Sequence, residues 1–267
     1  MARIRLLTYN IAHARGLSLH QSLRSRARIR AQLVNIAHLI RRLDADIVAF
    51  QEIDENSRWS GSFDHLAFLA EHTGLTHFVH GVNNRLTHFG GHLHLNYGNA
   101  ILSRFPILAS HNQDVTHLRF ERRGMLHCVI EAPGLAKPLH CVCVHLSLFG
   151  RSRRHQIDAL ASRLESIVPA DSPMLIAGDF NDWRNRAHDL LAERMGLTEV
   201  FSGRVARPPK SFPSALPLLR LDRIYARGFT IERTEVHCGM PWSRISDHAA
   251  LSAHLLPLLP FVPPARR

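Results

Sequence analysis

The stretch Met174-Leu-Ile-Ala-Gly-Asp-Phe-Asn-Asp182 decides the fold prediction for this chain. Its apolar residues lead directly into a polar cluster, which is typical of a buried strand that ends near Gly178. Asp179 and Asn181 are two positions apart, so in an extended chain their side chains point to the same side. Together they can hold a metal-bound water or a phosphate oxygen. The same residues also favour a simple turn, because Asp and Asn bond to their own backbone.

Other strand-like runs also carry polar side chains at one end. Polar residues close the runs Arg3–Asn10, Asp46–Glu52 and Leu139–His145, and they open the runs Asp222–Ala226 and Asp247–Leu255. If the last two run antiparallel to the others, all of these polar ends meet at one rim. Such a gathering of side chains on a rigid scaffold is typical of an active site.

Hydrophobic periodicity predicts the remaining elements. Helices are expected over Ser22–Leu43, Phe63–Ala70 (ending near Gly74), Ser152–Val168 and Ala187–Met195. Strands are expected over Thr76–Val82, Tyr97–Ser103, a run from Ile107, Met125–Glu131 (a hairpin with Leu139–His145, turned at Pro133-Gly134), Arg223–Ala226, Thr230–His237 and Ala249–Leu255. Many strands with a few helices predict an α/β protein in which two sheets pack face to face with helices outside.

The 267-residue chain shows no break in composition. We therefore expect a single domain over residues 1–256 and a Pro-rich tail over 257–267. It has no uninterrupted apolar stretch of membrane-spanning length and no secretory signal, so we expect a cytoplasmic monomer without a transmembrane segment. The 4 cysteines include no C-x-x-C pair, which predicts reduced thiols that mostly fill the core.

The formal net charge is +11, and only Lys137 and Lys210 among the 33 basic residues are lysines. The other basic residues are arginines, which bind phosphate with two parallel hydrogen bonds and keep their charge at all ordinary pH values. This excess of positive charge predicts a polyanionic substrate, with nucleic acid as the first candidate and an anionic lipid headgroup as the second.

Seven short motifs resemble, in chain order, those of the endonuclease/exonuclease/phosphatase superfamily, the DNase I-like proteins that include bacterial metal-dependent hydrolases. They are Thr8-Tyr9-Asn10, Phe50-Gln51-Glu52, Gly98–Arg104, His145-Leu146, Gly178–Asn181, Leu221-Asp222 and Ser246-Asp247-His248. The resemblance implies a four-layer α/β sandwich and divalent-metal-dependent phosphoester hydrolysis.

The resemblance also implies which residues hold the metal. Glu52 is the principal ligand, and Asn10, Asp247 and Asp179 contribute directly or through water. Mg²⁺ suits such a site because it prefers oxygen ligands and keeps most of its own waters, and Mn²⁺ is an alternative.

For the catalytic groups, the resemblance implies that Asp179 orients the attacking water with Asn181 beside it. His248 donates a hydrogen bond to the phosphoryl oxygen, and Asp222 fixes the tautomer and charge of that imidazole. His145 stabilises the transition state. Asn10 either supports the metal or bonds the phosphate.

Three further residues are candidates for substrate binding: Arg123, Tyr97 and Asn99. Arg123 could equally lie in a solvated loop, and strand packing would equally explain Tyr97. A His-rich loop with His88, His92 and His94 could form a second metal site or be a surface loop on the substrate side.

Three functions remain open at this point. The first is a metal-dependent phosphodiesterase acting on nucleic acid. The second is a lipid or small-molecule phosphodiesterase similar to the sphingomyelinases, because His145 stands where abasic-site endonucleases carry a Tyr-containing motif. The third is a non-catalytic anion-binding module, which predicts a broken motif, and none of the catalytic motifs is broken.

Overall fold

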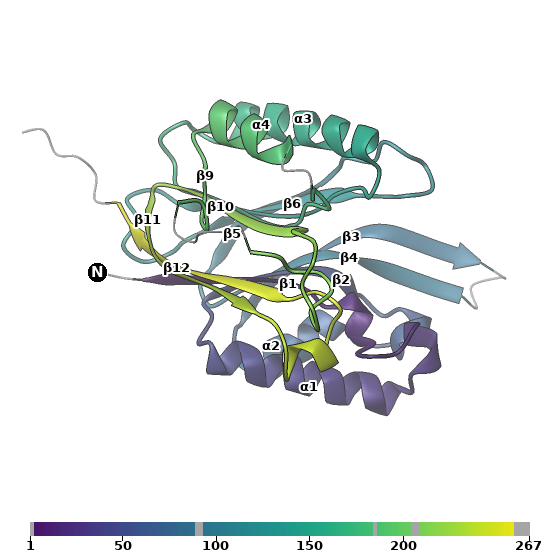
Figure 1. The fold of residues 1–267 in the computed structure, drawn as a ribbon. Helices are drawn as coiled ribbons and strands as arrows, with labels where there is room; N and C mark the ends of the chain where they lie inside the picture. Colours follow the sequence, from purple (N-terminus) through teal and green to yellow (C-terminus); the bar gives the residue numbers. More distant parts are fainter. Residues whose placement is uncertain (1–2, 89–92, 184–185, 204–208, 259–267) are drawn as a thin grey trace, which may run out of the picture.

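The structure is a computed structural model that describes residues 3–88, 93–183, 186–203 and 209–258. Two six-stranded sheets pack face to face, and helices cover the outer face of each sheet (Figure 1). The helices α1 and α2 lie below one sheet in this view, and α3 and α4 lie above the other. This arrangement confirms the predicted four-layer α/β sandwich.

The first sheet has the strand order β11-β12-β1-β2-β4-β3. Its strands are β1 (Ile4–Asn10), β2 (Ile47–Asp54), β3 (His77–His88), β4 (Leu93–Ser103), β11 (Phe229–His237) and β12 (Ala250–Pro257), and its helices are α1 (Arg26–Arg42) and α2 (His65–Thr73). At its centre β1 and β2 are parallel, and β12 runs antiparallel to β1.

The second sheet has the strand order β5-β6-β7-β8-β10-β9. Its strands are β5 (Ile107–Asp114), β6 (Gly124–Ile130), β7 (Leu139–His145), β8 (Met174–Asp179), β9 (Thr198–Glu199) and β10 (Asp222–Arg227), and its helices are α3 (Gly150–Ile167) and α4 (Arg186–Met195). Here β7 and β8 are the parallel pair, and β10 runs antiparallel to β8.

Both sheets therefore have a central parallel pair flanked by an antiparallel strand, a likeness that no sequence repeat indicated. The carboxyl ends of β1, β2, β7 and β8 lie at the same rim as the beginnings of β10 and β12. The strand directions on which the predicted gathering of polar ends depended are confirmed.

Three apolar layers hold the sandwich together. The layer between the sheets includes Leu6, Leu175 and Leu251, all buried. The other two layers lie between each sheet and its helices. In β1, Leu6 faces the opposite sheet and Leu7 faces the helices, so both faces of the strand are apolar. Central strands covered on both sides give continuous apolar runs, which is why the sequence revealed them.

Several predicted boundaries were wrong. The first helix begins at Arg26 and not at Ser22, because Ser25 caps it by accepting a hydrogen bond from the amide of Arg28. The strands β3 and β4 extend well beyond the predicted Thr76–Val82 and Tyr97–Ser103, because they pair with each other along a polar extension. Such a hairpin lacks the apolar pattern that predicts strands.

The strand β12 ends at Pro257, so the first residue of the expected tail belongs to the sheet. Residues 259–267, like residues 89–92 of the His-rich loop, lie outside the described part of the chain. Cys128, Cys141 and Cys143 are buried free thiols, as predicted, whereas Cys238 is exposed. Among the described residues, no helix is long and apolar enough to span a membrane.

Candidate active site

The end of β8 places Asp179 at the centre of the rim. Gly178 has a φ of +145°, and a Cβ on it would lie 2.0 Å from the carbonyl oxygen of Val144 in β7. Only glycine allows this close approach. In the strand register Asp179 then stands directly beside His145 on one side and Asp222 on the other.

The segment after Asp179 is also a turn, as the sequence allowed. Asn181 adopts a φ of 49°, and its amide donates to Asp179 Oδ1 at 2.9 Å. The Asn181 side chain donates to the carbonyl oxygen of Leu146 at 2.9 Å, which ties the loop after β7 to the loop after β8. The same residues therefore form a turn and position side chains of the site.

The carboxylate of Asp179 is 1% exposed and surrounded by nitrogen donors. Its Oδ2 lies 3.2 Å from Asn10 Nδ2, 3.5 Å from His145 Nε2 and 3.8 Å from His248 Nε2. Burial and the neighbouring Asp222 raise the pKa of Asp179 to about 7, although His248 and the Asn181 amide act in the opposite direction. A carboxyl with this pKa can exchange a proton near neutral pH.

His248 and Asp222 form a pair at the beginnings of β12 and β10. His248 Nδ1 donates to Asp222 Oδ2 at 2.9 Å, which leaves Nε2 directed toward Asp179. Burial alone would lower the pKa of His248, but Asp222 and Asp179 outweigh it and raise the pKa to about 10. The imidazole is therefore a cation at neutral pH. His145 differs, because burial and Arg123 lower its pKa well below the usual range.

Glu52 occupies a β-bulge. The register between β2 and β4 shifts between Phe50 and Ile53, and Glu52 has a φ of 52°. This irregularity turns Glu52 toward Asn10, whose Nδ2 lies 3.3 Å from Glu52 Oε1. The Asn10 amide nitrogen thus joins Glu52 to Asp179. Its oxygen accepts a hydrogen bond from the Ala12 amide at 3.1 Å, so in this conformation that oxygen is not turned toward a metal.

The residues present fit a divalent cation. The side chains of Glu52 and Asp247 are 29% and 33% exposed, so each carboxylate reaches the open side of the rim. Asp247 is held by an ion pair with Arg15. Ligand atoms of Asp179, Asp222 and His248 also lie within 4.8 Å of one another. We favour Glu52 as the principal ligand, since a metal at His248 would have to displace the proton of a strongly basic imidazole.

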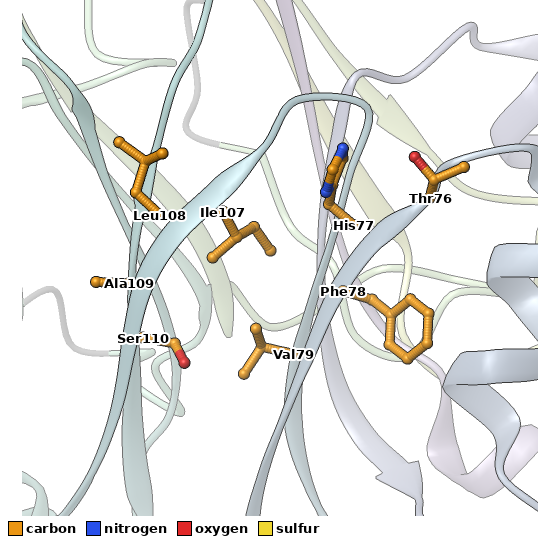
Figure 2. A pocket seen from close by; sticks show the side chains of 8 residues that line it. All are labelled: Thr76, His77, Phe78, Val79, Ile107, Leu108, Ala109 and Ser110. Atoms are coloured by element: carbon orange, nitrogen blue, oxygen red, sulfur yellow. The ribbon is translucent and has the colours of Figure 1, made fainter.

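A cavity of about 210 Å³ opens over this rim. Its lining includes Glu52, Arg123, His145, Leu148, Asp179, Asn181, Trp183, Phe212, Leu219, Leu221 and His248. A larger hollow of about 360 Å³ lies between β3 and β5, where Val79 and Ile107 point toward each other (Figure 2). His77 is the only titratable side chain among the residues that line this hollow. The smaller cavity holds the titratable side chains of the rim, which this larger hollow lacks.

The structure brings one of the three predicted substrate-binding residues into the cavity and leaves the other two outside it. Arg123 lines the cavity and is paired with Glu121 at 3.0 Å. Tyr97 packs against the rings of His13 and Trp59 and is not among the lining residues of the cavity. Asn99 is 1% exposed and donates to main-chain oxygens of the second sheet, so the structure does not bring it into the cavity either.

Sequence reasoning missed a second polar cluster beside Glu52. His13 Nδ1 lies 2.8 Å from Asp54 Oδ2, and the indole of Trp59 donates to Asp54 Oδ1 at 2.8 Å. His13 Nε2 lies 3.6 Å from Glu52 Oε2. Burial works against the His13 cation, but Asp54 outweighs it and raises the pKa of His13. The sequence signal that could have revealed this cluster is proximity along the chain, because His13 closely follows Asn10 and Asp54 closely follows Glu52.

The fold and the rim together define a DNase I-like α/β sandwich. Residues 7–248 match the model of the Endonuclease/Exonuclease/phosphatase family, and the chain belongs to this family. Endonucleases, exonucleases and phosphatases all hydrolyse phosphoester bonds, so membership assigns phosphoester hydrolysis to the chain as its reaction class.

One relative in sequence and several solved structures of the same fold are similar to this chain. The Escherichia coli (strain K12) protein YbhP is 37% identical over 231 residues, which cover 84% of this chain and 88% of YbhP. The endonuclease/exonuclease/phosphatase of Beutenbergia cavernae DSM 12333 superposes with a TM-score of 0.73 at 22% identity, covering 96% of this chain and 72% of that one. D. rerio TDP2, complexed with single strand DNA product, superposes with a TM-score of 0.69 at 16% identity, covering 96% and 100%.

Proposed function

We propose that the chain is a divalent-metal-dependent phosphodiesterase that cleaves its substrate by in-line attack of an activated water. The observation that carries this proposal is the placement of Asp179 between two differently charged neighbours. The His248 cation lies on one side, held by Asp222, and Asn10 lies on the other, bridging to Glu52. A group that can take a proton thus stands beside a fixed donor to phosphate.

Each residue has a defined task in this proposal. A water bound at Asp179 Oδ2 attacks phosphorus while its proton passes to that carboxylate, the new O–P bond forms and the bond to the leaving oxygen breaks. His248 Nε2 and neutral His145 donate hydrogen bonds to the non-bridging oxygens, where negative charge increases. Asp222 keeps His248 protonated and oriented.

Glu52 and Asp247 would hold Mg²⁺ or Mn²⁺, with Asp179 on the interior side, and the Asn10 amide nitrogen would position Glu52 and Asp179. The ion, when bound there, supplies charge neutralisation on the phosphoryl and leaving oxygens. The bulge at Glu52 and the Arg15–Asp247 pair keep the two carboxylates on the open side of the rim.

A polyanionic substrate fits the net charge of +11. Nucleic acid is the first candidate, and the shared fold of TDP2, which is seen with single strand DNA product, supports it. A phospholipid phosphodiester is the second candidate. It is favoured by the leucines exposed at the mouth of the cavity, Leu148 and Leu219, which offer no hydrogen bond to a nucleic acid. The anion-binding module is disfavoured because every catalytic side chain is present at the rim.

The experiment that tests this function measures hydrolysis of bis-p-nitrophenyl phosphate, plasmid DNA, single-stranded DNA, RNA, phosphatidylglycerol and sphingomyelin, with Mg²⁺ and with EDTA. We expect hydrolysis of at least one diester with Mg²⁺, its loss with EDTA, and its loss in Glu52→Ala and His248→Ala. Full activity of either variant, or activity that EDTA does not affect, would contradict the proposal.

A further inference from the structure

Large exposed apolar side chains gather around the mouth of the catalytic cavity. We define six of them as the apolar rim: Phe120, Leu148, Phe149, Trp183, Leu216 and Leu218. Their exposed fractions lie between 45% for Trp183 and 77% for Phe120. They come from the loops that follow β5, β7 and β8 and from the loop that precedes β10. Three of these loops adjoin strand ends that carry His145, Asp179 and Asp222.

Direct contacts join part of the apolar rim into one surface. The rings of Phe120 and Phe149 meet edge to face, with centroids 6.0 Å apart. Glu121 accepts a hydrogen bond from the Leu148 amide at 3.2 Å, which fastens the loop after β5 to the loop after β7. The guanidinium of Arg153 lies 5.1 Å from the Trp183 ring centroid and donates to the Leu148 carbonyl at 3.1 Å.

The apolar rim is also continuous with the catalytic cavity. Leu148 and Trp183 line the cavity themselves. The Leu218 amide donates to the carbonyl of Phe212 at 2.8 Å, and the Phe212 ring lies 5.0 Å from the ring of His248. A substrate that covers the apolar rim therefore also covers the catalytic cavity.

Positive charge accompanies the apolar rim. Arg119 and Arg122 lie in the loop with Phe120, and Arg151 and Arg154 lie in the first turn of α3, directly after Phe149; all four are exposed. Within the described part of the chain, none of these arginines has a carboxylate within ion-pair distance. The acid in the loop between Arg119 and Arg122, Glu121, is only 11% exposed and pairs with Arg123. The surface is therefore apolar and cationic at once.

We propose that the apolar rim docks the catalytic face on the surface of an anionic phospholipid bilayer. The proposal rests on the proposed phosphodiesterase function and, of the two candidate substrates given there, takes the second, a headgroup phosphodiester at the bilayer surface. Leucines such as Leu216 and Leu218 neither stack on bases nor donate hydrogen bonds, whereas at a bilayer their apolar surface leaves water. The unpaired arginines complement anionic headgroups. A base-stacking surface would need only flat aromatic rings such as Phe120, Phe149 and Trp183, and it would leave the three exposed leucines unexplained.

The test compares two triple variants of the full chain for binding to vesicles. The rim variant carries Phe120→Ser, Leu216→Ser and Leu218→Ser, none of which lines the cavity. The control variant carries Phe78→Ser, Leu108→Ser and Leu258→Ser, and removes the same residue types.

The control positions are also exposed, and they lie at the end of the sandwich opposite the catalytic rim, on β3, on β5 and directly after β12 (Figure 2 shows Phe78 and Leu108). Circular dichroism and the thermal unfolding midpoint establish that both variants fold. Co-sedimentation with vesicles of phosphatidylglycerol and phosphatidylcholine then measures binding, without requiring hydrolysis.

We expect the wild type and the control variant to bind the mixed vesicles, and the rim variant to bind at least about 10-fold more weakly. Vesicles of phosphatidylcholine alone should bind the wild type more weakly than the mixed vesicles do. Equal binding of the rim variant and the wild type, or no binding of the wild type, would overturn the proposal. The proposal would also be overturned if none of the three proteins bound vesicles and the rim variant had lost the binding of single-stranded DNA that the wild type shows. The apolar rim would then be a surface that stacks on bases. Vesicle binding without any phosphodiesterase activity would support the docking surface and contradict the proposed function.

Discussion

The replacement Asp222→Asn tests how the charge of His248 is maintained. The amide keeps the shape of the carboxyl but removes the negative charge 2.9 Å from His248 Nδ1. Asp222 is the strongest of the attractions that raise the pKa of His248 to about 10 against the effect of burial. If its loss returns that pKa to about 7, the cation loses about 4 kcal/mol of stabilisation, at 1.36 kcal/mol per pKa unit.

The consequence is a pH-dependent loss of activity. At pH 8.5 a histidine with a pKa of about 10 is almost wholly protonated, whereas one with a pKa of about 7 is only about 3% protonated, so kcat/KM should fall about 30-fold. At pH 6 both proteins carry the cation. Asp222 also raises the pKa of Asp179, so in the variant more Asp179 is ionised at low pH. The ratio of wild-type to variant kcat/KM should therefore be smallest near pH 6 and rise with pH.

The assay is hydrolysis of bis-p-nitrophenyl phosphate with Mg²⁺ from pH 6 to 9, with the His248 ring titrated by NMR in both proteins. Asp158→Asn, at a half-exposed carboxyl on α3, is the control and should leave the ratio at unity at every pH. A ratio for Asp222→Asn that is constant with pH would refute the reasoning, because a purely structural defect lowers activity equally at all pH values.

The remaining predictions concern the metal, the backbone and acid stability. Glu52→Ala, inactive at the Mg²⁺ concentration that saturates the wild type, should recover activity only at Mg²⁺ concentrations about 10-fold or more higher, as followed by metal titration after EDTA treatment. Gly178→Ala should lower the free energy of unfolding, measured in urea, by about 3 kcal/mol or more, because the alanine Cβ would lie 2.0 Å from the Val144 carbonyl oxygen. The control Gly203→Ala has open space around the new Cβ and should lower the free energy of unfolding by only about 1 kcal/mol. His127 has its pKa lowered to about 4 by burial and by His140, so the unfolded chain binds the extra proton between pH 6.5 and 4. Stability should fall by about 2 kcal/mol across that window after allowance for solvent screening, and His127→Gln should show a shallower fall in denaturant titrations.

Much of the architecture could be predicted from the sequence because the central strands are buried on both faces. Leu6 and Leu7 pack on opposite sides of β1, so apolar residues occupy both faces of a strand that ends at Asn10. The hairpin extension of β3 and β4 could not be predicted in this way, because its strands pair with each other and their side chains are largely polar. The start of α1 was misplaced for a local reason, the cap at Ser25, which periodicity alone does not reveal.

By itself, the sequence determined which segments along the chain form the central strands, the polar residue at one end of each of them, and the ordered motifs from Asn10 to His248. The tertiary structure alone decided which of these residues act together. The bulge that turns Glu52 toward Asn10 and the burial that raises the pKa of Asp179 depend on neighbouring strands distant in the chain. The apolar rim is likewise invisible in the sequence, where leucine predicts core. A side chain is buried or exposed according to what packs over it, and only the assembled loops leave Leu216 and Leu218 open to a partner.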